Sequence, residues 1–183
     1  MENAPNRCPF PILLLKKSSL KTVQLLLLLF LGSSISTIHI SDASKEYVRN
    51  YYENGTLKSE GWLDAQGKQD YWKFYYENGE VMQMGHFNNN LKHGYWYFYT
   101  SNGILEKEGH FIDGKMNLWW LFYDVNGQID HKCQLKNGQK NGYCLKYDHE
   151  EITSAEKYRN GTKIKEWFDF DSFRKENKLS DLR

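Results

Sequence analysis

The sequence predicts an all-β protein: an elongated, twisted antiparallel β-meander made of repeated two-stranded units of 24 residues. Two observations carry this prediction. An Asn-Gly dipeptide recurs at intervals of 24 residues without drift, and 27 of the 29 aromatic residues follow residue 40, with Thr, Asn and Gly between them. Aromatic-rich segments separated by turn residues are typical of β-strands and hairpins.

The first forty residues have a different character from the rest of the 183-residue chain. Their apolar run, Val23–Leu31, is followed by a stretch of small residues that ends near Thr37. The run is preceded by four cations: Arg7, Lys16, Lys17 and Lys21. A positive flank, a short apolar run and a small-residue tail are the three parts of an export signal, and cleavage is expected after Ser36.

Two other interpretations of this leader stay open. The stretch Val23–Ile40 is 18 residues long, and the 22 residues before it favour an uncleaved membrane anchor. A buried core element is the third interpretation. A cleaved signal and an anchor both place the rest of the chain outside the cytoplasm when the positive flank stays inside.

The repeat extends well beyond the Asn-Gly pairs. Each Gly is followed two residues later by an aliphatic residue and six residues later by a second Gly, which Cys133 replaces in the fourth copy. A Trp column and a Tyr column follow in register. The repeated positions include Asn54, Asn78, Asn102 and Asn126; Gly61, Gly85 and Gly109; Trp72, Trp96 and Trp120; and Tyr75, Tyr99, Tyr123 and Tyr147.

Each unit is expected to be a strand, a loop, a second strand and a tight turn into the next copy. Asn-Gly between alternating segments predicts a type I′ turn, in which both central residues have positive φ. The other junctions, such as Asp64–Lys68 and Asn88–Gly94, are expected to be longer polar loops.

Both faces of the sheet are expected to carry rings. In one strand Tyr95, Tyr97 and Tyr99 share a face, and Trp96 and Phe98 share the other. A stacked tryptophan column is expected to form the core, because each ring buries a large apolar area. The alternative role for such rings is an exposed platform for a glycan, peptide or lipid.

The segment from Gly67-Lys68 through Trp72, Tyr75-Tyr76, Asn78-Gly79 and Gly85 resembles the MORN repeat, in the variant form common in bacterial proteins. The resemblance covers about residues 47–170. It implies a β-repeat fold and a role in membrane association, lipid contact or protein–protein interaction. Variants of this form are often labelled antitoxin components of toxin–antitoxin systems.

Three regions follow from these patterns. Residues 1–40 are a signal peptide or N-terminal membrane anchor, 41–170 are a repeat domain of about four and a half units, and 171–183 are a C-terminal tail. The tail is expected to form a short helix with Asp171 or Ser172 as N-cap, and to cover the open sheet edge.

The sequence offers little for catalysis. It contains no nucleotide-binding, serine-hydrolase or zinc-protease motif. His86 and His110 are repeat equivalents about 10 Å apart by strand spacing, which is too far for one metal ion. Glu106 and Glu108 share a face but are expected to be salt-linked or solvated. We therefore expect no catalytic residues, no metal and no cofactor.

Cys133 and Cys144 lie on the two strands of one unit. In an oxidising compartment they could form a disulfide, although strand parity places them on opposite faces unless a bulge intervenes. Two buried free thiols are the alternative.

Charge excludes one class of partner. The net charge is +1, and the region after residue 40 is close to neutral, so a nucleic-acid partner is not expected.

The sequence predicts a non-enzymatic, exported or membrane-anchored protein that binds a protein or an envelope component, with membrane association open. An antitoxin or immunity protein is the alternative. The residues expected to be exposed for binding are Trp62, His86, Tyr97 and His110.

Overall fold

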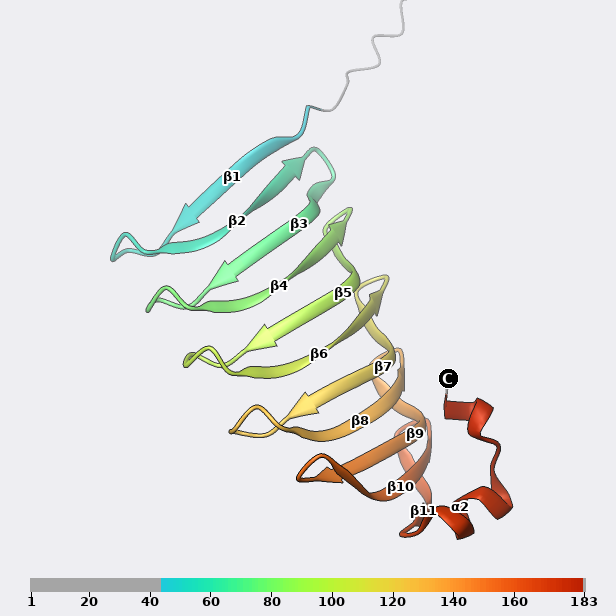
Figure 1. Ribbon diagram of the computed structural model, residues 1–183. Coiled ribbons are helices and arrows are strands. Elements are labelled where there is room, and N and C mark those ends of the chain that lie inside the picture. The colour runs from blue at the N-terminus through green and yellow to red at the C-terminus, as the bar shows by residue number, and fades with distance from the viewer. Residues whose placement is uncertain (1–43, 183) are drawn as a thin grey trace, which may run out of the picture. The chain divides into compact units, whose positions relative to one another are not determined.

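The computed structural model describes residues 44–182, and the predicted leader lies outside the described residues. These residues form one antiparallel sheet of eleven strands whose order in the sheet is their order in the chain (Figure 1). The predicted all-β meander is confirmed. The strands are β1 (Glu46–Tyr51), β2 (Leu57–Asp64), β3 (Gly67–Tyr75), β4 (Val81–Asn88), β5 (Leu91–Tyr99), β6 (Leu105–Ile112), β7 (Lys115–Tyr123), β8 (Ile129–Lys136), β9 (Gln139–Asp148), β10 (Glu151–Arg159) and β11 (Thr162–Trp167).

The turns at the Asn-Gly pairs differ from the prediction. Gly55 has a φ of +83°, but Asn54 is not among the residues with positive φ, so the turn is not type I′. The Gly55 N–H donates to the Tyr52 carbonyl, and the Asn54 side chain accepts from the Thr56 N–H. The type I′ assignment was wrong because only the glycine of each pair adopts the left-handed conformation, as in a three-residue hairpin loop with a glycine bulge.

The two-residue turns stand at the opposite ends of the hairpins. Asp113 and Gly114, between β6 and β7, have φ values of +49° and +75°. Asn89 and Asn90, between β4 and β5, have +48° and +64°. These junctions, expected to be longer loops, therefore have the positive φ at both central residues that type I′ turns need.

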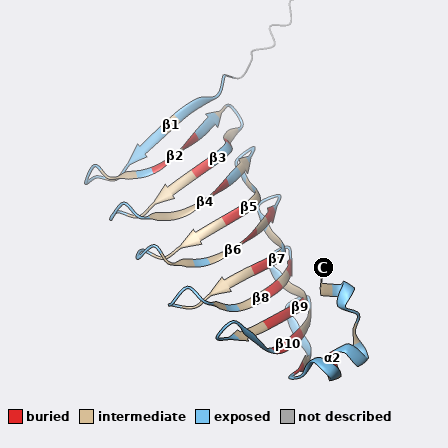
Figure 2. Cartoon of the chain, in the orientation of Figure 1, coloured by how far each residue is buried: buried red, intermediate tan, exposed pale blue. Residues whose placement is uncertain are grey.

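The tryptophan column forms the core. Trp96 and Trp120 are 0% exposed. Phenylalanines lie between them: Phe98 has its ring centroid 6.0 Å from both, and Phe111 meets Trp120 edge to face at 5.1 Å. Figure 2 shows buried residues in the middle of successive strands. The column is thus a ladder of alternating Trp and Phe rings on one face, here called the tryptophan face.

The two cysteines occupy the place that Gly and Trp hold in the other units. Cys133 and Cys144 are direct partners in the β8–β9 register, with Cα atoms 4.0 Å apart, and are joined by a disulfide. The disulfide was one of two predicted alternatives and was expected to need a bulge; the β8–β9 register does shift between Cys133 and Leu135.

The C-terminal segment after β11 contains helix α2 (Phe170–Glu176) and a 3-10 turn η1 (Leu179–Leu182). Asp169 is the N-cap, because its side chain accepts from the Ser172 N–H at 2.8 Å; the predicted caps, Asp171 and Ser172, lie two and three residues later and were wrong. Phe173 of α2 is buried against β-strand residues, so the segment covers a face of the last strands. No helix within residues 44–182 has the length and apolar character needed to cross a bilayer.

Candidate functional site: the tyrosine face of the sheet

The face opposite the tryptophan core carries rows of repeat-equivalent residues, and we call it the tyrosine face. Its best-defined row repeats every 24 residues and consists of Tyr71, Tyr95, Trp119 and Tyr143. Residues paired across neighbouring strands lie on the same face of a sheet. The pairs Tyr71–His86 and Tyr95–His110 therefore place both histidines on the tyrosine face.

The four residues predicted for binding all lie on this face. Trp62 of β2 is 40% exposed and meets Tyr47 edge to face at 5.2 Å. His86 is exposed and lies edge-on to Tyr71 at 5.0 Å. Tyr97 is half-buried and is paired with Met84 of β4.

His110 is half-buried and meets the Tyr95 ring at 4.8 Å. These contacts orient the predicted binding residues but do not place them in one cluster, because they are spread over four strands. Their role in binding stays a prediction.

Carboxylates anchor the tyrosine hydroxyls. Tyr123 donates to Glu108 at 2.5 Å, and Tyr75 donates to Glu60 at 2.8 Å. Burial first, and the adjacent Glu108 second, raise the pKa of Tyr95 to about 12. Tyr75, Tyr95 and Tyr123 therefore keep their hydroxyl protons at physiological pH.

The two glutamates expected to share a face are separated by a bulge: Tyr99 pairs with Leu105 and Phe98 with Lys107, so Glu106 lies beside Lys107 and not in the row of Glu108. Glu106 lies 3.1 Å from the ammonium of Lys107, as the salt-linked alternative predicted. Glu108 is half-buried and accepts the Tyr123 hydroxyl, so it belongs to the ring network. Within residues 44–182 no three His, Cys, Asp or Glu side chains come together as metal ligands.

One cation on the tryptophan face was missed by the sequence reasoning. The ammonium of Lys92 lies 4.2 Å from the Trp96 ring centroid, 4.6 Å from Phe98 and 5.2 Å from Phe111. Burial lowers the pKa of Lys92 to about 8, while the three rings favour its charged form. The one sequence signal for this position is strand alternation, which places Lys92 on the same face as its cross-strand partner Phe87.

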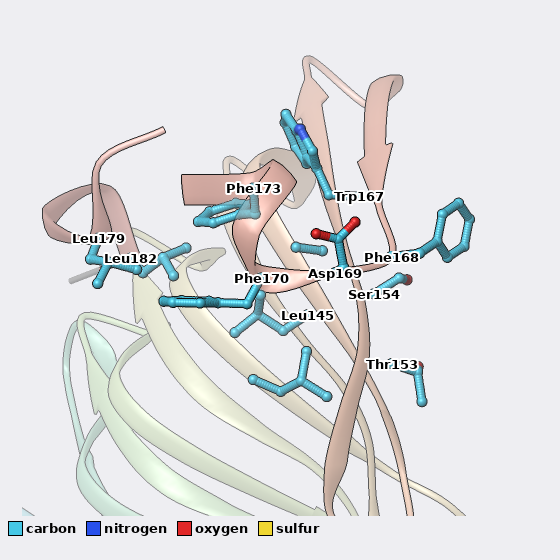
Figure 3. Close-up of a pocket in the computed structure, with 12 residues that line it drawn as sticks. Leu145, Thr153, Ser154, Trp167, Phe168, Asp169, Phe170, Phe173, Leu179 and Leu182 are labelled. Carbon is cyan, nitrogen blue, oxygen red and sulfur yellow. The ribbon is translucent and has the colours of Figure 1, made fainter. Parts of the chain in front are cut away.

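An apolar pocket of about 190 Å³ lies between the C-terminal segment and the last strands. Figure 3 shows Phe170 and Phe173 on the segment side and Leu145 on the sheet side. Asp169 also lines the pocket, but its carboxylate is occupied as the cap of α2. The lining therefore presents mainly apolar surface, and nothing in the sequence pattern signals it because it forms only when the tail folds back.

Comparison with known proteins agrees with the repeat geometry. The family model described as the MORN repeat variant matches residues 47–61, 71–89 and 92–113. These three segments are similar to the MORN repeat variant. The matched segments lie within the region of β1 to β6, and the family resemblance predicted from the sequence is confirmed for them.

No curated protein matches the chain. Among solved structures, the crystal structure of accessory secretory protein 1, 2 and 3 in Streptococcus pneumoniae is similar to this chain with 16% identity and a TM-score of 0.21. The similarity covers 62% of this chain and 21% of that chain, so the chain spans about a fifth of that relative's length.

Proposed function

We propose that this protein is a non-enzymatic MORN-repeat protein, exported or membrane-anchored, whose extended β surface binds a protein or an envelope component. The observation that supports binding is the tyrosine face. Its rings are held in position by ring contacts and carboxylates, yet Tyr71 and Trp62 remain 38% and 40% exposed. Half-exposed aromatic side chains in a rigid array are typical of interaction surfaces.

A site-specific cross-link tests binding by this face. A photoreactive phenylalanine analogue replaces Tyr97 in the full chain, and a matched variant carries it at Phe98, on the tryptophan face. We expect an adduct with a second macromolecule from position 97 and none from position 98. Equal labelling from both positions, or labelling from neither, would contradict the proposal.

The export part of the proposal rests on the leader, and its test is the mature amino terminus measured by mass spectrometry. A chain that begins near Thr37 supports a cleaved signal. An intact Met1 in an alkali-resistant membrane pellet supports an anchor. An intact chain recovered only in the soluble cytoplasmic fraction would contradict both.

The second candidate function is an antitoxin or immunity protein, which the family label implies. Its basis is that label alone. It requires a toxic partner that this chain neutralises. Co-expression with neighbouring genes tests it, and an absence of toxicity from every neighbour would count against it.

A further inference from the structure

The C-terminal segment shows how the tyrosine face can be covered. Phe173 of α2 meets the Tyr143 ring edge to face at 5.6 Å and Trp167 at 5.3 Å. The Tyr143 hydroxyl donates to Asn177 Oδ1 at 2.7 Å. As a result Tyr143 is 3% exposed, whereas its repeat equivalent Tyr71 is 38% exposed.

The covered part is basic and the segment on it brings carboxylates. Lys132 lies over the Trp119 ring at 4.9 Å, and Lys157 lies over Tyr143 at 4.9 Å. Lys165 of β11 contacts Glu176 of α2 at 2.7 Å. An aromatic anchor and a carboxylate on the segment thus meet rings and lysines on the sheet.

The same rows continue, uncovered by this segment, over the preceding strands, but with the opposite charge. One repeat before Lys132, the equivalent position is Glu108. Glu108 pairs with Tyr97, whose ring centroid lies 5.1 Å from that of Tyr95. A ligand on this open part therefore meets rings and a carboxylate, which favour an apolar anchor next to a cation.

Building on the proposed binding function, we infer that the open part of the tyrosine face, over β4–β7, binds an amphipathic helix of a partner protein that carries an aromatic or leucine anchor and lysine or arginine residues. The partner helix lies as α2 lies on the last strands, with its charge reversed. Tyr97 contacts the anchor, and Glu108 contacts a cation.

The test uses the full chain and two labelled synthetic peptides. One has the sequence of residues 168–182, and the other carries Asp171→Lys, Glu176→Lys and Asp181→Lys. Fluorescence anisotropy is expected to show at least tenfold tighter binding of the basic peptide. Equal affinities, or no binding of the basic peptide at millimolar concentration, would overturn the inference.

Variants of the full chain locate the contact. Tyr97→Ala and Glu108→Gln are each expected to weaken basic-peptide binding about fivefold to tenfold, while Lys107→Gln on the tryptophan face leaves it unchanged. Glu108→Gln keeps the shape of the side chain, so it remains informative if Tyr97→Ala fails to fold. Basic-peptide binding that neither variant changes overturns the inference.

Two further measurements exclude other occupants. Sedimentation with vesicles of phosphatidylcholine and phosphatidylglycerol that depends on Tyr97 would identify a membrane surface instead, and a dimer that depends on Tyr97 would identify a second copy. Either result overturns the inference. If a partner cross-links at position 97 but the basic peptide does not bind, this inference is overturned, whereas the proposed binding function is still supported.

Discussion

The indole ring of Trp120 occupies the space in which a side chain on Gly109 would stand. A Cβ added to Gly109 would lie 2.5 Å from Trp120 Cδ2. The indole N–H donates to the carbonyls of His110 and Asn117 at 3.1 and 3.2 Å, so the ring cannot move away freely. The same arrangement joins Gly85 and Trp96 one repeat earlier, which explains why the repeat needs Gly and Trp together.

Gly109→Ala should therefore destabilise the sheet strongly. Overpacking of a closed core costs about 1–3 kcal/mol, and we expect the upper end of this range because the ring is hydrogen-bonded. Urea unfolding measures the loss. The matched control is Gly79→Ala, which has open space around its Cβ but a φ of +89°, and it should cost only about 1 kcal/mol. Equal losses in the two variants would contradict the ring-contact explanation.

Leu118→Gly should stabilise the protein. Leu118 has a φ of +63° at the position where Gly94 stands in the preceding repeat, and its side chain is 53% exposed, so little packing is lost. Relief of the left-handed backbone strain, about 1–2 kcal/mol, exceeds the entropy cost of a glycine, about 0.5–1 kcal/mol. Thermal unfolding should show a net gain of about 0.5–1 kcal/mol. The reverse change, Gly94→Leu, should lower the melting temperature, and a stabilising Gly94→Leu would refute the argument.

Reduction of the disulfide between Cys133 and Cys144 should lower stability by about 2–3 kcal/mol, because the bond closes a short loop between two strands of one unit. Unfolding with and without dithiothreitol measures the change. The double variant Cys133→Ala/Cys144→Ala provides the control: it should be destabilised and insensitive to the reductant. If dithiothreitol does not change the free energy of unfolding of the wild-type chain, the disulfide contributes nothing to stability.

Stability should rise with pH between about 7.5 and 9.5 because of Lys92. Its pKa falls to about 8 in the folded state from an unfolded value of 10.5, so the unfolded chain binds more protons in this interval. We expect a gain of about 1 kcal/mol, since the rings around the ammonium oppose part of the shift. Lys92→Met removes this titration, so its urea midpoint should rise less over the same interval; the remaining rise comes from Lys140, whose pKa burial also lowers. A parallel rise in both proteins would assign the effect to other groups.

Above pH 10 the dependence of stability on pH reverses its sign. Burial, and hydrogen bonds to Glu60 and Glu108, raise the pKa values of Tyr75 and Tyr123 above 10, so the folded chain then holds protons that the unfolded chain has lost. Stability should fall as the pH rises further. Tyr123→Phe should weaken this fall, and absorbance of tyrosinate at 295 nm should show Tyr123 ionising only on unfolding.

Much of this fold was predictable because the repeat is local. The 24-residue period places Trp96 and Trp120 at equivalent positions, and strand parity places Tyr95 and Tyr97 on the other side, so the meander and its two ring-bearing faces follow from neighbours in sequence. The predicted binding residues, such as His86 and His110, could be assigned to one face for the same reason.

The turn types were less predictable. Asn54 and Gly55 match the preference for a type I′ turn, but the conformation depends on how many residues lie between the last paired residues of the two strands. That number is set by the register of β1 and β2, which ring packing determines and which an isolated dipeptide does not reveal.

The sequence alone determined the repeat, the strand order and the residues that alternate between the faces, because these depend on short-range periodicity. The tertiary structure decided that Cys133 meets Cys144, that Lys92 lies among rings, and that Phe173 covers Tyr143 while Tyr71 stays open. These contacts depend on bulges and on a tail that folds back over strands distant in sequence. Their free energy comes from long-range packing, which no local pattern records.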